Sequence, residues 1–137
     1  MKIIQKRNVK LLFDKRRKKD SHKNDYGHCF ILAGSIGFTG AGCLTALGAL
    51  KIGAGLVTIG IPQSLNQIVE IKLTEIMSLC LPETEEHTIN STAEKTIFKF
   101  ISQRKINVLA IGPGLSCNKS THVLVRNIIK KFSGTII

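Results

Sequence analysis

Two glycine-rich loops contain the residue types most suited to ligand binding. The first covers residues 34–42 (Gly-Ser-Ile-Gly-Phe-Thr-Gly-Ala-Gly). Its glycines let the backbone approach a ligand, and free N–H groups at the start of a following helix attract anions. It is not a P-loop, because no Lys-Ser/Thr pair follows its last glycine, and Thr45 stands where the dinucleotide fingerprint needs glycine or alanine. The pattern alone favours a phosphate- or nucleotide-binding loop and a tight packing turn equally.

The second loop is Gly112-Pro113-Gly114-Leu115. Proline fixes its own φ angle and the flanking glycines allow unusual φ values, so the turn is rigid and almost free of side chains. Such a turn suits a flat ligand ring, although the pattern taken alone favours a plain loop. A third polar segment, residues 20–27, holds His22 and Tyr26 but defines no catalytic set. We interpret its histidine as structural.

Apolar runs that alternate with helix-like segments must position these loops. The pattern predicts an α/β fold with a parallel sheet, in which both glycine loops follow strands. Ligands bind at the carboxyl ends of strands in such sheets. The expected strands cover residues 29–33, 56–61, 76–81, 106–111 and 135–137, and the expected helices cover 41–52, 63–73, 91–104 and 119–132. The last helix is expected to direct Val123, Leu124, Ile128 and Ile129 inward.

The cysteines and histidines predict no metal site. The four cysteines are widely separated, none forms a CxxC pair, and no histidine completes a zinc pattern. Cys29, Cys43 and Cys80 lie in apolar or small-residue runs and are expected to be buried. The remaining histidines (His28, His87 and His122) are expected at the surface or at strand edges, without partners. Unpaired cysteines, the lack of a secretory signal and the lack of an 18-residue apolar run predict a cytoplasmic protein without a membrane span.

The positive charge is concentrated at the amino terminus. The 137 residues carry a net charge of +11, with ten Lys and Arg against two Asp in residues 1–23. We therefore divide the chain into a basic leader, residues 1–19, and one domain, residues 20–137. An alternative function is a non-catalytic nucleic-acid-binding module that uses the basic segment. The segment lacks interleaved aromatic residues for base stacking, which favours a solvated leader.

A set of motifs in a fixed order indicates a family. Together they resemble the ATP/ADP-dependent NAD(P)H-hydrate dehydratases, which are ribokinase-like metabolite-repair enzymes. The resemblance extends from about Lys15 to Ile137. The motifs are Asp20-Ser21-His22-Lys23-x-x-Tyr26-Gly27-His28, Ala33-Gly34-Ser35, Thr39-Gly40-Ala41, Gly53-Ala54-Gly55-Leu56-Val57, Glu75-x-Met77 and Ile111-Gly112-Pro113-Gly114-Leu115.

The resemblance implies a fold, a reaction and a substrate site. The fold would be the N-terminal part of a ribokinase-like three-layer αβα sandwich with a mainly parallel sheet. The reaction would be dehydration of hydrated NADH or NADPH, in which ATP or ADP phosphorylates the hydroxyl and phosphate then leaves. Ala41 and Gly114 match positions that contact the hydrated dinucleotide, and Gly40, Gly112 and Ser35 would support them.

The sequence also departs from the family pattern. Asn24 stands where the family usually has glycine, and Thr74 stands where a proline usually precedes the glutamate. The family's acidic, nucleotide-binding and anion-hole motifs, including the catalytic aspartate, do not occur here. We therefore expect an inactive fragment or half-enzyme, whose ATP or ADP and Mg²⁺ bind outside this chain. A companion C-terminal half and a homo-oligomer both remain open as partners, as does the preference between NADH hydrate and NADPH hydrate.

Overall fold

A five-stranded sheet organises residues 19–137, the part of the chain that the computed structural model describes. Its strand order is β3-β2-β1-β4-β5, and all four strand pairs are parallel. The predicted α/β fold with a parallel sheet is therefore confirmed. The expected leader, apart from Lys19, lies outside the described residues. The strands are β1 (His28–Leu32), β2 (Leu56–Pro62), β3 (Met77–Leu81), β4 (Val108–Ile111) and β5 (Thr135–Ile136).

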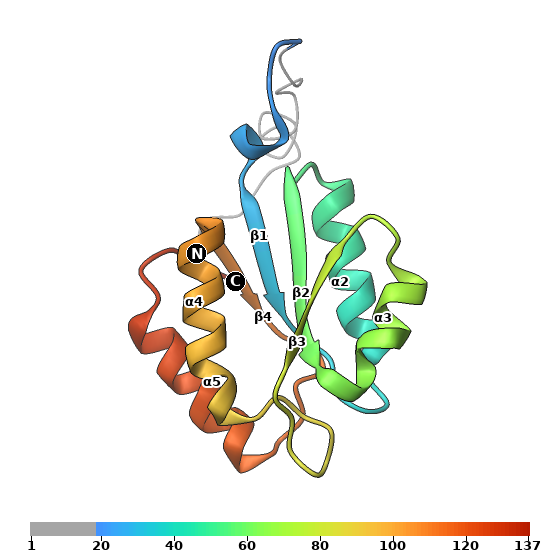
Figure 1. Ribbon diagram of the computed structural model, residues 1–137, viewed down its shortest axis with the longest axis vertical. Helices are drawn as coiled ribbons and strands as arrows, with labels where there is room; N and C mark the ends of the chain where they lie inside the picture. Colours follow the sequence, from blue (N-terminus) through green and yellow to red (C-terminus); the bar gives the residue numbers. More distant parts are fainter. Residues whose placement is uncertain (1–18) are drawn as a thin grey trace, which may run out of the picture.

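Helices cover the two faces of the sheet (Figure 1). One face carries α2 (Thr39–Lys51) and α3 (Asn66–Lys72), and the other carries α4 (Glu94–Arg104) and α5 (Lys119–Lys131). Short 3-10 turns precede β1, α3 and α4; these are η1 (Lys23–Tyr26), η2 (Gln63–Leu65) and η3 (Ser91–Ala93). The chain is therefore arranged in three layers, helix on sheet on helix.

After His28, the central strand β1 is wholly apolar because both of its faces are covered. Successive side chains of a strand point to opposite faces. Ile31 accordingly belongs to the core cluster under α2 and α3, whereas Phe30 and Leu32 belong to the cluster under α4 and α5. All three side chains are buried. This pattern is typical of a central strand in a doubly wound sheet.

The strand order reverses at β1. This strand pairs with β2 on one side and with β4 on the other, because α4 returns the chain from β3 across the opposite face of the sheet. The loops that follow β1 and β4 therefore leave the sheet beside each other in opposite directions. Open α/β sheets bind ligands at such a switch point, outside the carboxyl ends of the strands. Both predicted glycine loops border it.

Three burial expectations were wrong. Val123 and Ile129 of α5 are 51% and 53% exposed, because this helix turns only the stripe through Leu124 and Ile128 toward the sheet. Cys80 is exposed because it lies on β3, which pairs with β2 alone and forms one edge of the sheet. Among the other cysteines expected inside, Cys43 is buried and Cys29 is half-buried.

His28 was also assigned wrongly, since it is neither exposed nor without a partner. It is 6% exposed, and its Nε2 shares a hydrogen bond of 2.8 Å with Thr58 Oγ1 on β2. Its place on the central strand, between two neighbours, accounts for the burial. Burial lowers the pKa of the imidazole; a hydrogen bond with the Arg104 backbone raises it, and the Arg104 charge lowers it again, so the net pKa is below 6.5.

This depressed pKa predicts acid sensitivity. Below about pH 6.5 the unfolded chain binds a proton at residue 28 that the folded chain resists, so stability is present above this pH and falls as the pH drops through the folded pKa. We expect His28→Gln to flatten the decline in unfolding free energy between pH 7.5 and 5.5. Urea denaturation of both chains at several pH values measures this, and parallel pH profiles would contradict it.

Candidate functional site

Hydrogen bonds fasten the two glycine loops to each other at the switch point. The Gly34 N–H donates to the Pro113 carbonyl at 3.0 Å, and the Gly112 N–H donates to the Leu32 carbonyl at 2.7 Å. The Ser35 hydroxyl donates to the Gly114 carbonyl at 2.8 Å. Segments almost 80 residues apart in sequence thus form one wall, and three of the predicted site residues (Ser35, Gly112 and Gly114) lie in it.

Glycine is required at Gly114 by the contact between the loops. Its φ is +76°, in the left-handed region that favours glycine. A Cβ added there would lie 2.8 Å from the Phe38 Cβ and 3.3 Å from the Phe38 carbonyl oxygen. The packing explanation for this turn is therefore sufficient at Gly114. Gly40 differs, because a Cβ there would meet nothing within 4 Å.

The first turn of α2 holds the other two predicted residues, Gly40 and Ala41. Gly40 is exposed and Ala41 is half-buried. The helix begins at Thr39, two residues earlier than expected, so both residues are helical. Phe38 caps the helix without a side-chain hydrogen bond, and the first turn has no acidic residue. Helix N–H groups without a side-chain partner carry partial positive charge, which suits an anionic group of a ligand.

Two apolar side chains at this site were not singled out from the sequence. Ile36 and Phe38 are 57% and 58% exposed, although both lie within the first glycine loop. The sequence could have indicated them, because large apolar residues between the glycines of a loop have no strand or helix face through which to be buried. Together they leave exposed apolar surface beside the uncapped helix end, and apolar surface of this kind suits a planar ring.

The segment that follows β3 supports the first loop. The Ile36 N–H donates to the His87 carbonyl at 3.4 Å. Glu83 holds this segment to η2 by accepting hydrogen bonds from the Ser64 N–H (3.0 Å) and hydroxyl (2.7 Å). Partial burial raises the pKa of the Glu83 carboxyl, but hydrogen bonds from Ser64 and His87 outweigh it and leave the pKa below its usual value. This contact could not be predicted from the sequence, because residues 82–90 lie between the expected elements 76–81 and 91–104 and carry no pattern of their own.

The described residues do not fit a metal centre. Within residues 19–137, no group of three or more His, Cys, Asp or Glu side chains lies close enough together to hold an ion. Mg²⁺ is held in proteins mainly through carboxylates and substrate phosphates.

No helix in this part of the chain is long and apolar enough to span a bilayer.

The fold has counterparts among known proteins. A ribokinase-like superfamily protein from Enterococcus faecalis superposes with a TM-score of 0.74 at 18% identity, over 92% of this chain and 42% of that one, which places the chain in the ribokinase-like fold class. The family model for NAD(P)H-hydrate dehydratase matches residues 29–137. The chain belongs to the NAD(P)H-hydrate dehydratase family.

Two relatives extend this similarity. A bifunctional NAD(P)H-hydrate repair enzyme, Nnr, from Moorella thermoacetica is 40% identical over 116 residues, which are 85% of this chain and 22% of the relative. The crystal structure of an ADP/ATP-dependent NAD(P)H-hydrate dehydratase from Bacillus subtilis, co-crystallised with ATP and Mg²⁺, gives a TM-score of 0.60 at 27% identity, over 84% of this chain and 38% of that one. The chain thus spans less than half the length of each of these relatives.

Proposed function

We propose that this chain forms the substrate wall of an enzyme that dehydrates hydrated NADH or NADPH back to NAD(P)H. The observation that carries the proposal is the wall at the switch point, where hydrogen bonds join the loop before α2 to the Gly112–Gly114 turn. Membership of the NAD(P)H-hydrate dehydratase family supplies the substrate class.

Each residue has a role in this proposal. Ala41 and Gly114 contact the hydrated dinucleotide, because a small side chain or none leaves room for a close approach. Gly40 keeps the first turn of α2 open, and the uncapped N–H groups of that turn face a phosphate. Ser35 and Gly112 act indirectly, through the hydrogen bonds that fix the two loops.

In this proposal the phosphate donor binds away from the two glycine loops. We propose that ATP or ADP, with Mg²⁺, is held by a companion half of the domain, because the described residues do not fit a metal ion. The Bacillus subtilis relative, named as an ADP/ATP-dependent enzyme, supports nucleotide dependence. The proposal places the chain in the cytoplasm, where its four free cysteines would stay reduced.

Substitutions at Gly40 test the proposal. Because a Cβ at Gly40 meets nothing within 4 Å, Gly40→Leu should leave the fold intact and place a bulky side chain at the first turn of α2, and we expect at least a tenfold loss of affinity for hydrated NADH. Gly40→Ala is the matched control, expected to raise helix stability by up to about 1 kcal/mol with a smaller loss of affinity. Titration of the 137-residue chain, followed through its backbone amide NMR signals, measures both. Equal affinity in Gly40→Leu, or no binding by the unsubstituted chain, would overturn the proposal.

A further inference from the structure

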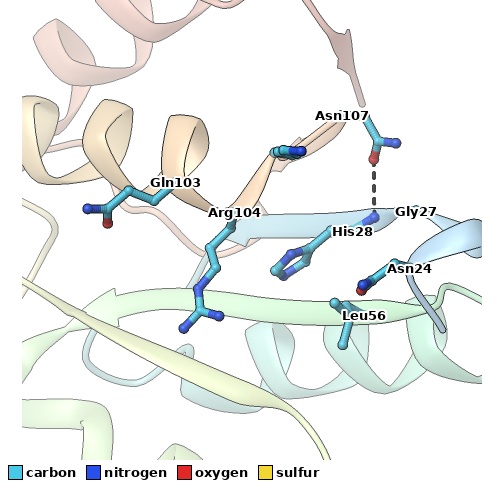
Figure 2. Close-up of a pocket in the computed structure, with 8 residues that line it drawn as sticks. Asn24, Gly27, His28, Leu56, Gln103, Arg104 and Asn107 are labelled. Carbon is cyan, nitrogen blue, oxygen red and sulfur yellow. Dashed lines mark hydrogen bonds between the residues drawn. The ribbon is translucent and has the colours of Figure 1, made fainter. Parts of the chain in front are cut away.

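A hollow lies at the amino end of the sheet, opposite the two glycine loops. It has a volume of about 430 Å³, within the range of small-molecule sites. It is bordered by the amino ends of β1 and β2, by η1 and by the turn between α4 and β4 (Figure 2). The substrate wall lies at the carboxyl ends of parallel strands of the same sheet. The hollow and the wall are therefore separated by the length of the strands. The lining residues are Asn24, Gly27, His28, Leu56, Gln103, Arg104, Lys105 and Asn107.

The polar segment that precedes β1 forms the rim of this hollow. Residues 20–27 contributed to the family resemblance, but none of them belongs to the substrate wall. Its position is fixed, since the Gly55 N–H donates to the Tyr26 carbonyl at 3.1 Å and the Leu56 N–H donates to the Gly27 carbonyl at 3.0 Å. A Cβ on Gly55 would overlap the Lys23 carbonyl oxygen. Asn24 is thereby held at the mouth of the hollow.

Hydrogen-bond donors line the hollow above a buried histidine. His28 forms the floor, and its backbone N–H donates to Asn107 Oδ1 at 3.2 Å (Figure 2). Because the Asn107 oxygen accepts this bond, the amide nitrogen of the same side chain remains to donate. Asn24 adds a second side-chain amide from η1.

Two cations at the end of α4 give the hollow a positive charge. Within residues 19–137, neither Arg104 nor Lys105 forms an ion pair. The Arg104 guanidinium lies 6.0 Å from the centroid of the Phe100 ring, which restrains it beside the hollow. The last carbonyls of α4 contribute a partial charge of about −0.5, which two full positive charges outweigh. The neighbouring carboxylate of Asp25 is engaged by the His22 N–H at 2.8 Å.

We propose that this hollow binds the phosphate group of a small phosphorylated molecule. A guanidinium matches phosphate oxygens with two parallel hydrogen bonds, a lysine adds a point charge, and two amides supply further donors. Two adjacent cations match the dianionic charge of a phosphate monoester better than the single charge of a carboxylate. The concave shape favours a small ester over a nucleic-acid strand, which needs an open groove. The site is independent of the function proposed for the substrate wall.

Matched charge substitutions test this site. Inorganic phosphate and ribose 5-phosphate are titrated separately into the 137-residue chain, with the amide signals of His28, Asn107 and Gly114 observed. We expect saturable shifts at His28 and Asn107 and none at Gly114. Arg104→Gln should weaken binding roughly 10- to 100-fold, as for loss of charge-assisted hydrogen bonds. Asn24→Gly should weaken it severalfold. Lys99→Gln removes the same charge from α4 away from the hollow and should have no effect.

The outcomes distinguish a phosphate ester from inorganic phosphate as the ligand, and distinguish both from non-specific charge attraction. Tighter binding of the sugar phosphate identifies an ester as the ligand, and tighter binding of inorganic phosphate identifies the free anion; either supports the site. Equal weakening by Arg104→Gln and Lys99→Gln would overturn it, since that result indicates general charge attraction. Shifts confined to Gly114, no saturable binding, or binding of a random DNA oligonucleotide without binding of either phosphate would overturn it as well. Thermal unfolding of each variant confirms that it is folded.

Discussion

Gly114→Ala is expected to destabilise the fold by about 2–5 kcal/mol and to lower the affinity for hydrated NADH by at least tenfold. An alanine with φ near +76° costs about 1–2 kcal/mol. Its Cβ would also lie 2.8 Å from the Phe38 Cβ, and such overpacking costs about 1–3 kcal/mol. Relief of this contact moves the two loops apart and distorts the substrate wall. Urea denaturation and ligand titration of the same variant measure the two effects.

The matched control for this substitution is Gly48→Ala. Gly48 lies within α2, has no positive φ, and a Cβ there would meet nothing within 4 Å. The same added methyl group should therefore leave stability unchanged or raise it by up to about 1 kcal/mol. Stability and affinity in Gly114→Ala equal to those of Gly48→Ala would show that the contact between the loops does not shape the site.

Local patterns were sufficient to predict the elements. Each expected strand and helix is present, because apolar runs bounded by Gly or Pro define buried strands directly. The run 29–33, for example, differs by one residue from β1, and the Ala- and Leu-rich run 41–52 differs by at most two residues from α2 at either end. The same patterns predicted that both glycine loops follow strands. The observed strand order makes these two strands neighbours, which brings the loops together at the switch point.

Contacts between distant segments were not predictable from a single sequence. His28 was assigned to a strand edge, because nothing local shows that β1 is the central strand with Thr58 beside it. The support of Ile36 by the His87 carbonyl depends on a backbone contact across 51 residues. The faces of α5 were misjudged at Val123 because four apolar residues offered a wider stripe than the sheet covers.

The two ends of the sheet have separate roles in this interpretation. The carboxyl end carries the substrate wall, formed by the two glycine-rich loops, which are fastened through Ser35 and Gly112. The amino end carries the hollow, formed by charged and amide side chains around His28. A substitution confined to one end should therefore change one kind of binding and spare the other, because the intact core of the sheet lies between them.

Gly55→Ala tests whether a change at the amino end of the sheet affects phosphate binding alone. Its Cβ would overlap the Lys23 carbonyl oxygen, which is backbone and cannot rotate away, so we expect η1 to detach at a cost of about 3 kcal/mol, the upper end of overpacking costs. Loss of the bond from the Leu56 N–H to the Gly27 carbonyl should accelerate hydrogen exchange at Leu56. Phosphate binding should then weaken at least severalfold, while hydrated NADH still binds the substrate wall. Gly48→Ala again serves as the control, and slow exchange at Leu56 in Gly55→Ala would refute the expectation.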